Sequence, residues 1–397
     1  MAKSKKDETK DKSDEILSAQ EILGKALNNN KEDHFNDQEE IILPKVSSGS
    51  LILDSQLGGG FDSGLHRFVG FTEGGKTSEC LEVMRNFLQV IPNSRALLVK
   101  AEGRLSKDMQ ERSGIKFTWN FNEWVEGTCF VLETNVYELA IGVMRDLVLN
   151  NPDNKNKYVF TLDSIDALVL KSDLDKPIDG NNKVAGGPAL TKKFMQRMAI
   201  AMNKFGHQCL MIGQVSAKVE IDQYGPKDQR QISATGGNAA MHFANWILQF
   251  EPRYKTDLIL ENPDAPIDPI KNKILGHWCK IIIKKSPNEK SNVTVTYPIK
   301  YGRTNGTSIW KEYEITDVLV MFEKVSKKNP RKSPEETDKK PGGAWFYLDI
   351  DLYEDIKKSV GVEPPEKFQG LNNLRKYLEE NQNVTNFLFE KLKRMIS

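Results

Sequence analysis

The segment Gly70 to Thr77 constrains the fold of this chain more than any other. It reads G-F-T-E-G-G-K-T and matches the phosphate-binding pattern G-x-x-x-x-G-K-[ST]. A short apolar stretch at Phe68 and Val69 precedes it, and a helical apolar pattern follows. Such a loop binds phosphate where backbone N–H groups and a helix N-terminus face the anion together. The sequence therefore predicts a strand, a phosphate loop and a helix in succession.

The side chains of this loop predict its ligand. Lys76 can reach the β- and γ-phosphates of a nucleotide, and the hydroxyl of Thr77 can ligate Mg²⁺. Ser78 is a weaker second hydroxyl. We therefore expect a nucleoside triphosphate to bind with Mg²⁺. The residues expected around it are Gly70, Phe71, Thr72, Glu73, Gly74, Gly75, Lys76, Thr77 and Ser78.

Composition excludes several classes of protein. The net charge of +1 gives no overall sign of nucleic-acid binding, although local loops can still supply phosphate contacts. The 4 cysteines are scattered, which favours buried reduced thiols over disulfides or a zinc site. No apolar run approaches the ~20 residues of a membrane span. The charged N-terminus does not resemble a secretory signal, so we expect a cytoplasmic protein.

Strand-like apolar runs alternate with helical patterns through the central region. This alternation predicts an α/β fold with a mostly parallel central sheet flanked by helices. Two later runs, Cys279–Ile283 and Val293–Tyr297, are expected to form an antiparallel pair. The other expected strands are Ala96–Val99, Tyr158–Leu162, Cys209–Gly213 and Asn245–Phe250, and the expected helices include Val136–Leu149, Phe194–Phe205, Leu371–Glu379 and Val384–Ile396.

Four regions follow from changes in composition along the chain. Residues 1–40 form an N-terminal segment, in which Glu15–Leu27 has the spacing of an amphipathic helix. Its apolar face needs a partner, either its own core or a neighbouring subunit. Residues 41–323 are the nucleotide-binding core, 324–341 a charged linker, and 342–397 a small C-terminal α+β domain.

Three polar residues follow expected strands and complete the predicted site. Asp163 is the candidate carboxylate beside Mg²⁺, and Glu102 is a candidate base for the attacking water. Gln214 ends another strand, where its amide could bind a terminal phosphate. Since parallel strands end at one edge of a sheet, all three can lie near the phosphate loop. The alternative for each is an ordinary solvated loop residue.

Taken together, these motifs resemble the RecA family of DNA strand-exchange ATPases, most closely the phage UvsX-like branch. A-T-G-G-N-A at Ala234–Ala239 is the most specific match. The matches follow family order over most of the chain. Besides the phosphate loop, they are Ser47–Gly64, Ala101–Glu102, L-D-S at 162–164, G-Q at 213–214 and Gly342–Phe346.

The resemblance implies a RecA-type ATPase core that uses ATP and Mg²⁺. It makes Glu102 the catalytic carboxylate and Gln214 a γ-phosphate sensor, acting with Lys76. It also places Ser164 beside the nucleotide, and Lys284 and Lys285 at the nucleotide across a subunit interface. Two residues depart from the family pattern: Lys100 replaces an acidic residue, and Met109 replaces an aromatic one expected near the base.

The two mobile DNA-binding loops of the family correspond to Lys171–Leu190 and Val215–Asn238. Tyr224 lies among cations, which suits stacking on single-stranded DNA, although a loop tyrosine packed on its own domain is the alternative. The residues expected at DNA are Gly186, Gly187, Lys218, Tyr224, Gly225, Lys227, Arg230, Thr235, Gly236, Gly237 and Asn238.

The function implied is a DNA-dependent ATPase that forms helical homo-oligomeric filaments on single-stranded DNA and pairs it with a homologous duplex. A single-strand-binding protein and a loader are expected as further partners, in a bacterial or phage-infected cytoplasm. Two alternatives stay open. One is a RecA-fold helicase or DNA motor, and the other is a non-catalytic recombination mediator.

Overall fold

The structure is a computed structural model that describes residues 18–31, 34–103, 105–174, 186–217, 232–234, 242–268, 270–303, 308–331 and 345–396. The chain divides into two compact units, Met1–Glu40 and Ile41–Ser397. Within the described ranges, no helix combines the length and the apolar character that crossing a membrane requires.

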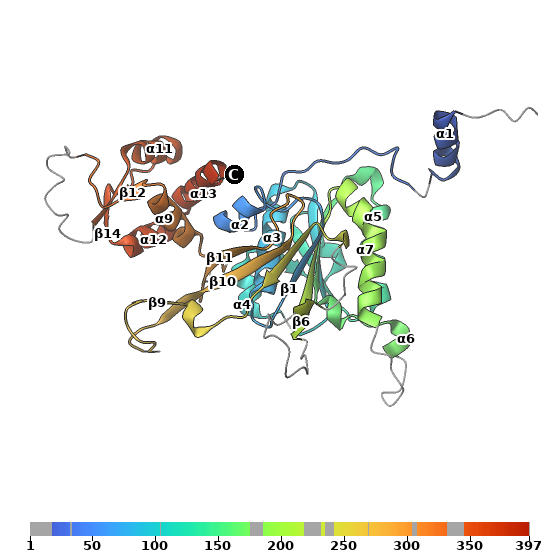
Figure 1. Cartoon of the computed structure of the whole chain (residues 1–397), viewed down its shortest axis with the longest axis horizontal. Coiled ribbons are helices and arrows are strands. Elements are labelled where there is room, and N and C mark those ends of the chain that lie inside the picture. The colour runs from blue at the N-terminus through green and yellow to red at the C-terminus, as the bar shows by residue number, and fades with distance from the viewer. Residues whose placement is uncertain are drawn as a thin grey trace, which may run out of the picture. The chain divides into compact units, whose positions relative to one another are not determined.

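The first unit contains helix α1, Ala19–Asn29 (Figure 1). A capping box begins it: the hydroxyl of Ser18 accepts from the Glu21 N–H at 3.3 Å, and the Glu21 carboxylate accepts from the Ser18 N–H at 2.8 Å. The helix begins at Ala19 after the cap at Ser18, and the first residues of the predicted helix, 15–17, lie outside the described residues. Ile22 and Leu23 are 56% and 60% exposed.

A large mixed sheet forms the centre of the second unit, in the order β11-β10-β8-β1-β6-β5-β2-β4-β3. All neighbours from β8 to β3 are parallel, and β10 pairs antiparallel with β8 and β11. This confirms the predicted fold class and antiparallel pair. The path runs through β11 (Val293–Lys300), β10 (Ile274–Lys285), β8 (Trp246–Phe250), β1 (Gly64–Gly70), β6 (Gln208–Ala217), β5 (Lys157–Asp163), β2 (Ser94–Lys100), β4 (Thr128–Glu133) and β3 (Lys116–Thr118).

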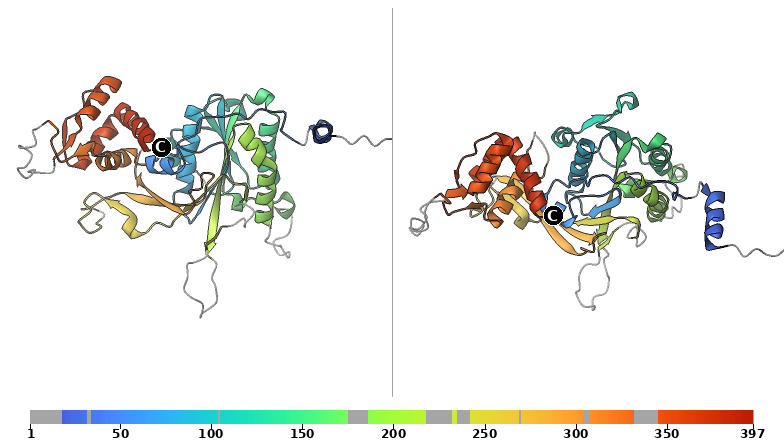
Figure 2. Two further views of the ribbon diagram at one scale, coloured as in Figure 1. Left: turned by 45° about the horizontal axis from the view of Figure 1, so that its top comes forward. Right: turned by 90° about the horizontal axis from the view of Figure 1, so that it is seen from above.

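Helices cover both faces of this sheet (Figures 1 and 2). Helix α3, Lys76–Val90, packs on one face, and α5, Tyr137–Leu149, and α7, Gly186–Lys204, lie on the other. The apolar stripe of α3 through Cys80 and Phe87 is fully buried, as its spacing predicts. All 4 cysteines are free and buried, and the reduced state of their thiols remains a prediction.

The remaining elements are short or C-terminal. Among them, α12 and α13 confirm the two helices predicted near the C-terminus. The full set of these remaining elements is β7 (Ile232–Ala234), β9 (Leu258–Leu260), β12 (Val325–Ser326), β13 (Trp345–Leu348), β14 (Lys367–Gln369), α2 (Leu51–Gln56), α4 (Lys107–Ser113), α6 (Lys171–Leu174), α9 (Lys311–Met321), α11 (Ile350–Val360), α12 (Leu371–Glu380), α13 (Gln382–Ile396) and the 3-10 turns η2 (Phe121–Glu123), η3 (Pro152–Asn154), η4 (Ile165–Ala167) and η5 (Lys255–Asp257).

The C-terminal elements share a hydrophobic core with part of the preceding region. Leu51 of α2 and Leu319 of α9 are buried in one cluster with Leu378 and Leu388 of the last two helices. A small three-stranded sheet, β12-β13-β14, lies beside these helices. The predicted division into a core, a linker and a C-terminal domain remains a prediction.

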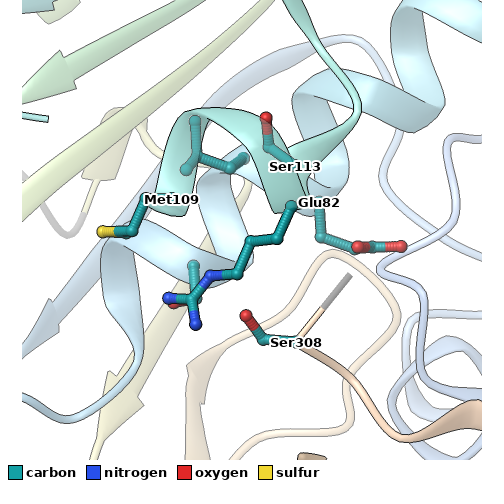
Figure 3. Close-up of a pocket in the computed structure, with 7 residues that line it drawn as sticks. Glu82, Met109, Ser113 and Ser308 are labelled. Atoms are coloured by element: carbon teal, nitrogen blue, oxygen red, sulfur yellow. The ribbon is translucent and has the colours of Figure 1, made fainter. Parts of the chain in front are cut away.

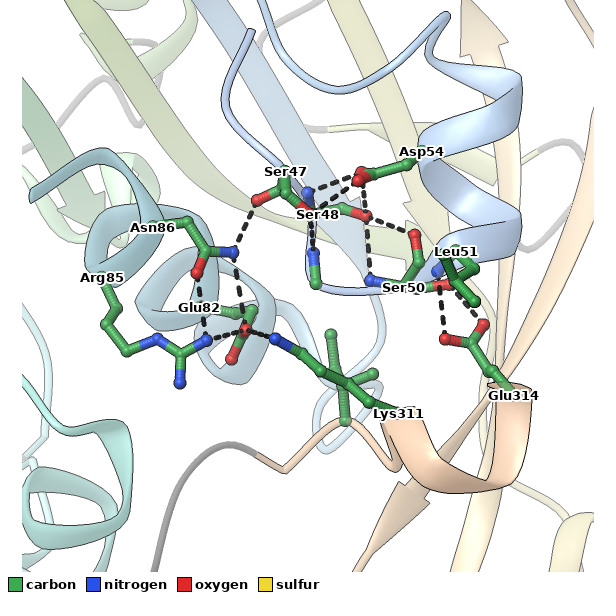
Figure 4. A network of polar contacts seen from close by, with 12 residues as sticks. Ser47, Ser48, Ser50, Leu51, Asp54, Glu82, Arg85, Asn86, Lys311 and Glu314 are labelled. Carbon is green, nitrogen blue, oxygen red and sulfur yellow. Dashed lines mark hydrogen bonds and ion pairs between the residues drawn. The ribbon is translucent and has the colours of Figure 1, made fainter. Parts of the chain in front are cut away.

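A buried polar network joins α2, α3 and α9 (Figure 4). The carboxylate of Glu314 accepts from the Ser50 hydroxyl at 2.6 Å and from the Leu51 N–H at 3.1 Å, so it binds the first turn of α2. Asp54, on the same helix, pairs with Lys393 at 2.9 Å. These contacts fix α2, which precedes β1 and the phosphate loop.

Candidate nucleotide-binding site

The phosphate loop lies between the end of β1 and the start of α3, as predicted. A side chain at Gly70 would place a Cβ 2.3 Å from the carbonyl oxygen of Phe250. Gly75 caps α3 with φ 100°, in the left-handed region that favours glycine. The glycines thus let the backbone curl against β8 and turn into the helix. This cradle fits a phosphate group at a helix N-terminus.

Lys76 is held inside the loop. Its ammonium donates to the carbonyl oxygens of Gly70 at 2.9 Å and Phe71 at 2.6 Å, and the residue is only 8% exposed. Burial lowers the pKa of Lys76, and the nearby charge of Asp163 opposes this. Nucleotide phosphates would replace these neutral carbonyl acceptors with negatively charged oxygens.

Contacts from β10 and from the segment after β8 support the outside of the loop. The Cys279 thiol donates to the carbonyl of Gly74 at 3.4 Å. The Glu73 carboxylate pairs with Arg253 at 3.2 Å. Phe71 is half-buried and Thr72 is exposed. The predicted loop residues therefore form one continuous turn, and β10 and the segment after β8 contact its backbone and side chains.

The predicted metal-side carboxylate lies beside the loop. One oxygen of Asp163, at the end of β5, is 3.5 Å from the hydroxyl of Thr77. The same oxygen accepts from the Lys100 ammonium at 2.6 Å. Ser164 is fully buried, and its hydroxyl has no hydrogen-bond partner in the described part of the chain.

Thr77 and Asp163 fit a Mg²⁺ ion whose other ligands are phosphates and water, the usual arrangement at nucleotide sites. A metal ion bound by protein side chains alone would need a larger cluster of ligands. Among the described residues, no cluster of three or more histidine, cysteine or acidic side chains could hold a metal.

Glu102 and Gln214 meet at the same edge of the sheet. Glu102 follows β2 and is exposed, while Gln214 belongs to β6 opposite Gly70 of β1. The Gln214 side-chain amide donates to the two Glu102 oxygens at 3.4 and 3.5 Å. Residues far apart in sequence are thus brought together at the loop, as the strand pattern predicted.

Asp166, in the turn η4, is a site residue that the sequence analysis missed. Its carboxylate accepts from the Gln214 backbone N–H at 2.6 Å. Burial raises the pKa of Asp166, and the Gln214 N–H and the charge of Arg67 oppose this. Arg67 is 2% exposed. The only available signal was that Asp166 shortly follows Asp163.

A small pocket lies beside α3 and α4 (Figure 3). Ser78, Met109, Arg112 and Ser308 line it. Ser78 therefore faces this pocket together with Met109, the residue that replaces the expected aromatic. A role of either residue in contacting nucleotide remains a prediction.

Lys284 and Lys285 do not lie at the loop of their own chain. β10 runs antiparallel to β8, with Ile281 opposite Phe250 and Lys285 opposite Ile247. Each strand residue advances by about 3.3 Å, so both lysines lie toward the opposite edge of the sheet. Lys285 donates to the His242 carbonyl at 2.9 Å.

The structure describes only part of the predicted DNA-binding segments. Gly186 and Gly187 begin α7, and α6 occupies the start of the first segment, so helices replace both ends of this predicted loop. In the second, Val215–Ala217 pairs antiparallel with Ile232–Ala234. The described ends of this expected mobile segment are therefore paired as strands. Lys218, Tyr224, Gly225, Lys227, Arg230, Thr235, Gly236, Gly237 and Asn238 lie outside the described residues.

Similar proteins are found along nearly the whole chain. It is 23% identical over 380 residues to protein RecA of Rickettsia africae, covering 95% of this chain and 91% of the relative. The identity to protein RecA of Porphyromonas gingivalis is 22% over 359 residues, or 88% and 85% of the two chains. No family model matches the chain. The full-length similarity supports a place in the RecA family, while the phage UvsX-like branch remains a prediction.

Proposed function

We propose that this chain is an ATP-hydrolysing DNA recombinase of the RecA family, from the phage UvsX-like branch. It would form filaments on single-stranded DNA and promote homologous pairing and strand exchange. The full-length similarity to RecA proteins supports the coarser part of this proposal, a nucleotide-using protein of DNA recombination and repair. The finer activity depends on the geometry of the site.

One observation carries the proposal. Gln214 contacts Glu102 at the nucleotide edge and belongs to the strand that continues into the β6–β7 hairpin. The segment proposed to bind DNA, Val215–Asn238, begins directly after Gln214 and includes the end of β6 and all of β7. A side chain that senses the terminal phosphate is therefore joined directly to the DNA segment. Nucleotide switches use such short connections between phosphate and a movable element.

The proposed roles follow from the contacts. Lys76 would leave the loop carbonyls to bind the β- and γ-phosphates, and Glu102 would accept a proton from the attacking water. Mg²⁺ bound beside Thr77 and Asp163 would neutralise charge that develops on the phosphates. Asp166 would hold the Gln214 backbone in place while the side-chain amide of Gln214 binds the γ-phosphate.

Assembly completes the proposal. The exposed face of α1 with Ile22 and Leu23 would pack on an adjacent subunit, and Lys284 and Lys285 would reach the nucleotide across that interface. The expected partners are single-stranded DNA, a homologous duplex, a single-strand-binding protein and a loader. The proposed location is the cytoplasm of a bacterium or of a phage-infected host.

The Gln214→Ala variant tests the link between nucleotide and DNA. Single-strand affinity should be measured with an ATP analogue, with ADP and without nucleotide. We expect wild-type protein to bind more tightly with the ATP analogue, and the variant to bind weakly in all three conditions. Gln89→Ala is the control, because Gln89 is an exposed glutamine near the far end of α3. A full nucleotide response in the Gln214 variant would refute the link.

An ATPase assay separates this proposal from its rivals. Hydrolysis stimulated by single-stranded DNA, together with strand exchange between homologous molecules, supports the recombinase. Stimulated hydrolysis with duplex unwinding and without strand exchange would instead support a helicase or motor. Absence of turnover with normal DNA binding would support a non-catalytic mediator.

A further inference from the structure

Lys100 lies at the end of β2, directly opposite Asp163 in the parallel pair formed with β5. Residues opposite each other in a parallel pair point to the same face of the sheet. The Lys100 ammonium is 2.6 Å from the Asp163 carboxylate, and the two side chains are only 9% and 7% exposed. This is a nearly buried ion pair.

The carboxylate oxygen that binds Lys100 is the oxygen facing Thr77. A positive side chain therefore occupies the acceptor that would otherwise serve the metal ion. Charges this poorly exposed to water interact more strongly than surface pairs, because solvent screens them less. Lys100 thus balances the negative charge of Asp163 next to Thr77 of the phosphate loop.

We propose that Lys100 is an internal cation that reduces the dependence of nucleotide binding on Mg²⁺. The inference rests on the proposed nucleotide-binding function and extends it. With Lys100 present, the phosphates meet a neutralised Asp163 even when no metal is bound. Without it, Asp163 would repel the phosphates unless Mg²⁺ lay between them. Lys100 is a positioning and charge-balancing residue and takes no part in the bond-breaking step.

The test measures binding of a fluorescent ADP probe in Mg²⁺ and in excess EDTA, so no hydrolysis is required. We compare the ratio of the two dissociation constants between proteins. In Lys100→Met, which keeps much of the aliphatic side chain, we expect this ratio to rise by about tenfold or more over wild type. Lys100→Arg keeps the charge and should retain the wild-type ratio.

Lys157→Met is the matched control. Lys157 is also buried, at the other end of β5, but its ammonium donates to backbone carbonyls, those of Asn154 at 2.6 Å and Phe205 at 3.0 Å. Its loss should leave the ratio unchanged. An equal rise in Lys157→Met, or a wild-type ratio in Lys100→Met, would overturn the inference.

Thermal unfolding without nucleotide gives a second reading. Lys100→Met leaves a buried carboxylate without its cation, so its metal-free melting temperature should fall, and Mg²⁺ alone should partly restore it. If this variant does not fold, the wild-type protein alone provides the test. A loss of more than about a hundredfold in its affinity for the probe when EDTA replaces Mg²⁺ would overturn the inference. Failure of wild-type protein to bind the probe at all would overturn the proposed function as well.

Discussion

Replacing Glu314 by glutamine should make the chain more stable at neutral pH. Glu314 is 1% exposed and binds the first turn of α2 through Ser50 and Leu51. Burial raises its pKa from 4.5 to about 7, and the charge of Asp54 adds to this, while the hydrogen bonds from Ser50 and Leu51 oppose it. Glutamine resembles the protonated form and can still exchange hydrogen bonds with both partners.

The sign and size follow from proton linkage. The folded pKa exceeds the unfolded one, so the folded state holds a proton that the unfolded state has lost between pH 4.5 and about 7. The contribution of Glu314 to stability is complete below pH 4.5 and is lost as the pH rises through 7. At about 1.4 kcal/mol per pH unit, the loss approaches about 3 kcal/mol. Glu314→Gln avoids it.

Urea unfolding of both proteins between about pH 4.5 and 8 measures this effect. The variant's free energy of unfolding minus that of wild type should rise with pH and level off above about 7. Glu323→Gln, a change at an exposed carboxylate just after α9, should give a flat difference. A flat difference for Glu314→Gln as well would refute the reasoning.

Four further outcomes are expected. Lys76→Ala should abolish ATP-dependent filament formation, which electron microscopy detects, and near-normal hydrolysis would contradict its assignment. Glu102→Gln should retain ATP and DNA binding but hydrolyse ATP about 10²–10⁴-fold more slowly in a single-turnover assay. Deleting residues 1–36 should leave a folded, ATP-binding protein that does not form long filaments, as sedimentation would detect. Normal filament assembly of this variant would show that α1 is not part of the subunit interface. Tyr224→Ala should weaken single-strand binding by about 1–3 kcal/mol with little dependence on sequence, as titrations with different oligonucleotides would reveal.

Local patterns predicted much of the fold and part of the site. The glycine spacing predicted the loop between β1 and α3, because few backbones other than a curled one accept that pattern. The polar residues after apolar strands predicted that Glu102 and Gln214 share one edge of the sheet. The edge at which a residue lies follows from chain direction alone, so it can be predicted even when the order of the strands is not known.

The missed contacts depend on strand order and side-chain reach. Lys100 reaches Asp163 only because β2 and β5 are neighbours in register, which no local pattern encodes. Asp166 reaches the Gln214 backbone because β5 and β6 are also neighbours. The capping box of α1 at Ser18 was also missed, since apolar spacing alone does not reveal a cap.

The position of β1 has a consequence for how the protein opens. β1 is buried at every residue and pairs with β6 on one side and β8 on the other. Amides in such a strand exchange with solvent only when the whole unit unfolds, whereas frayed segments exchange through small openings. The phosphate loop is thus anchored to a strand whose amides we expect to exchange slowly. Bound nucleotide should therefore slow amide hydrogen exchange throughout the sheet, because a ligand that binds only the folded state stabilises the entire unit through mass action.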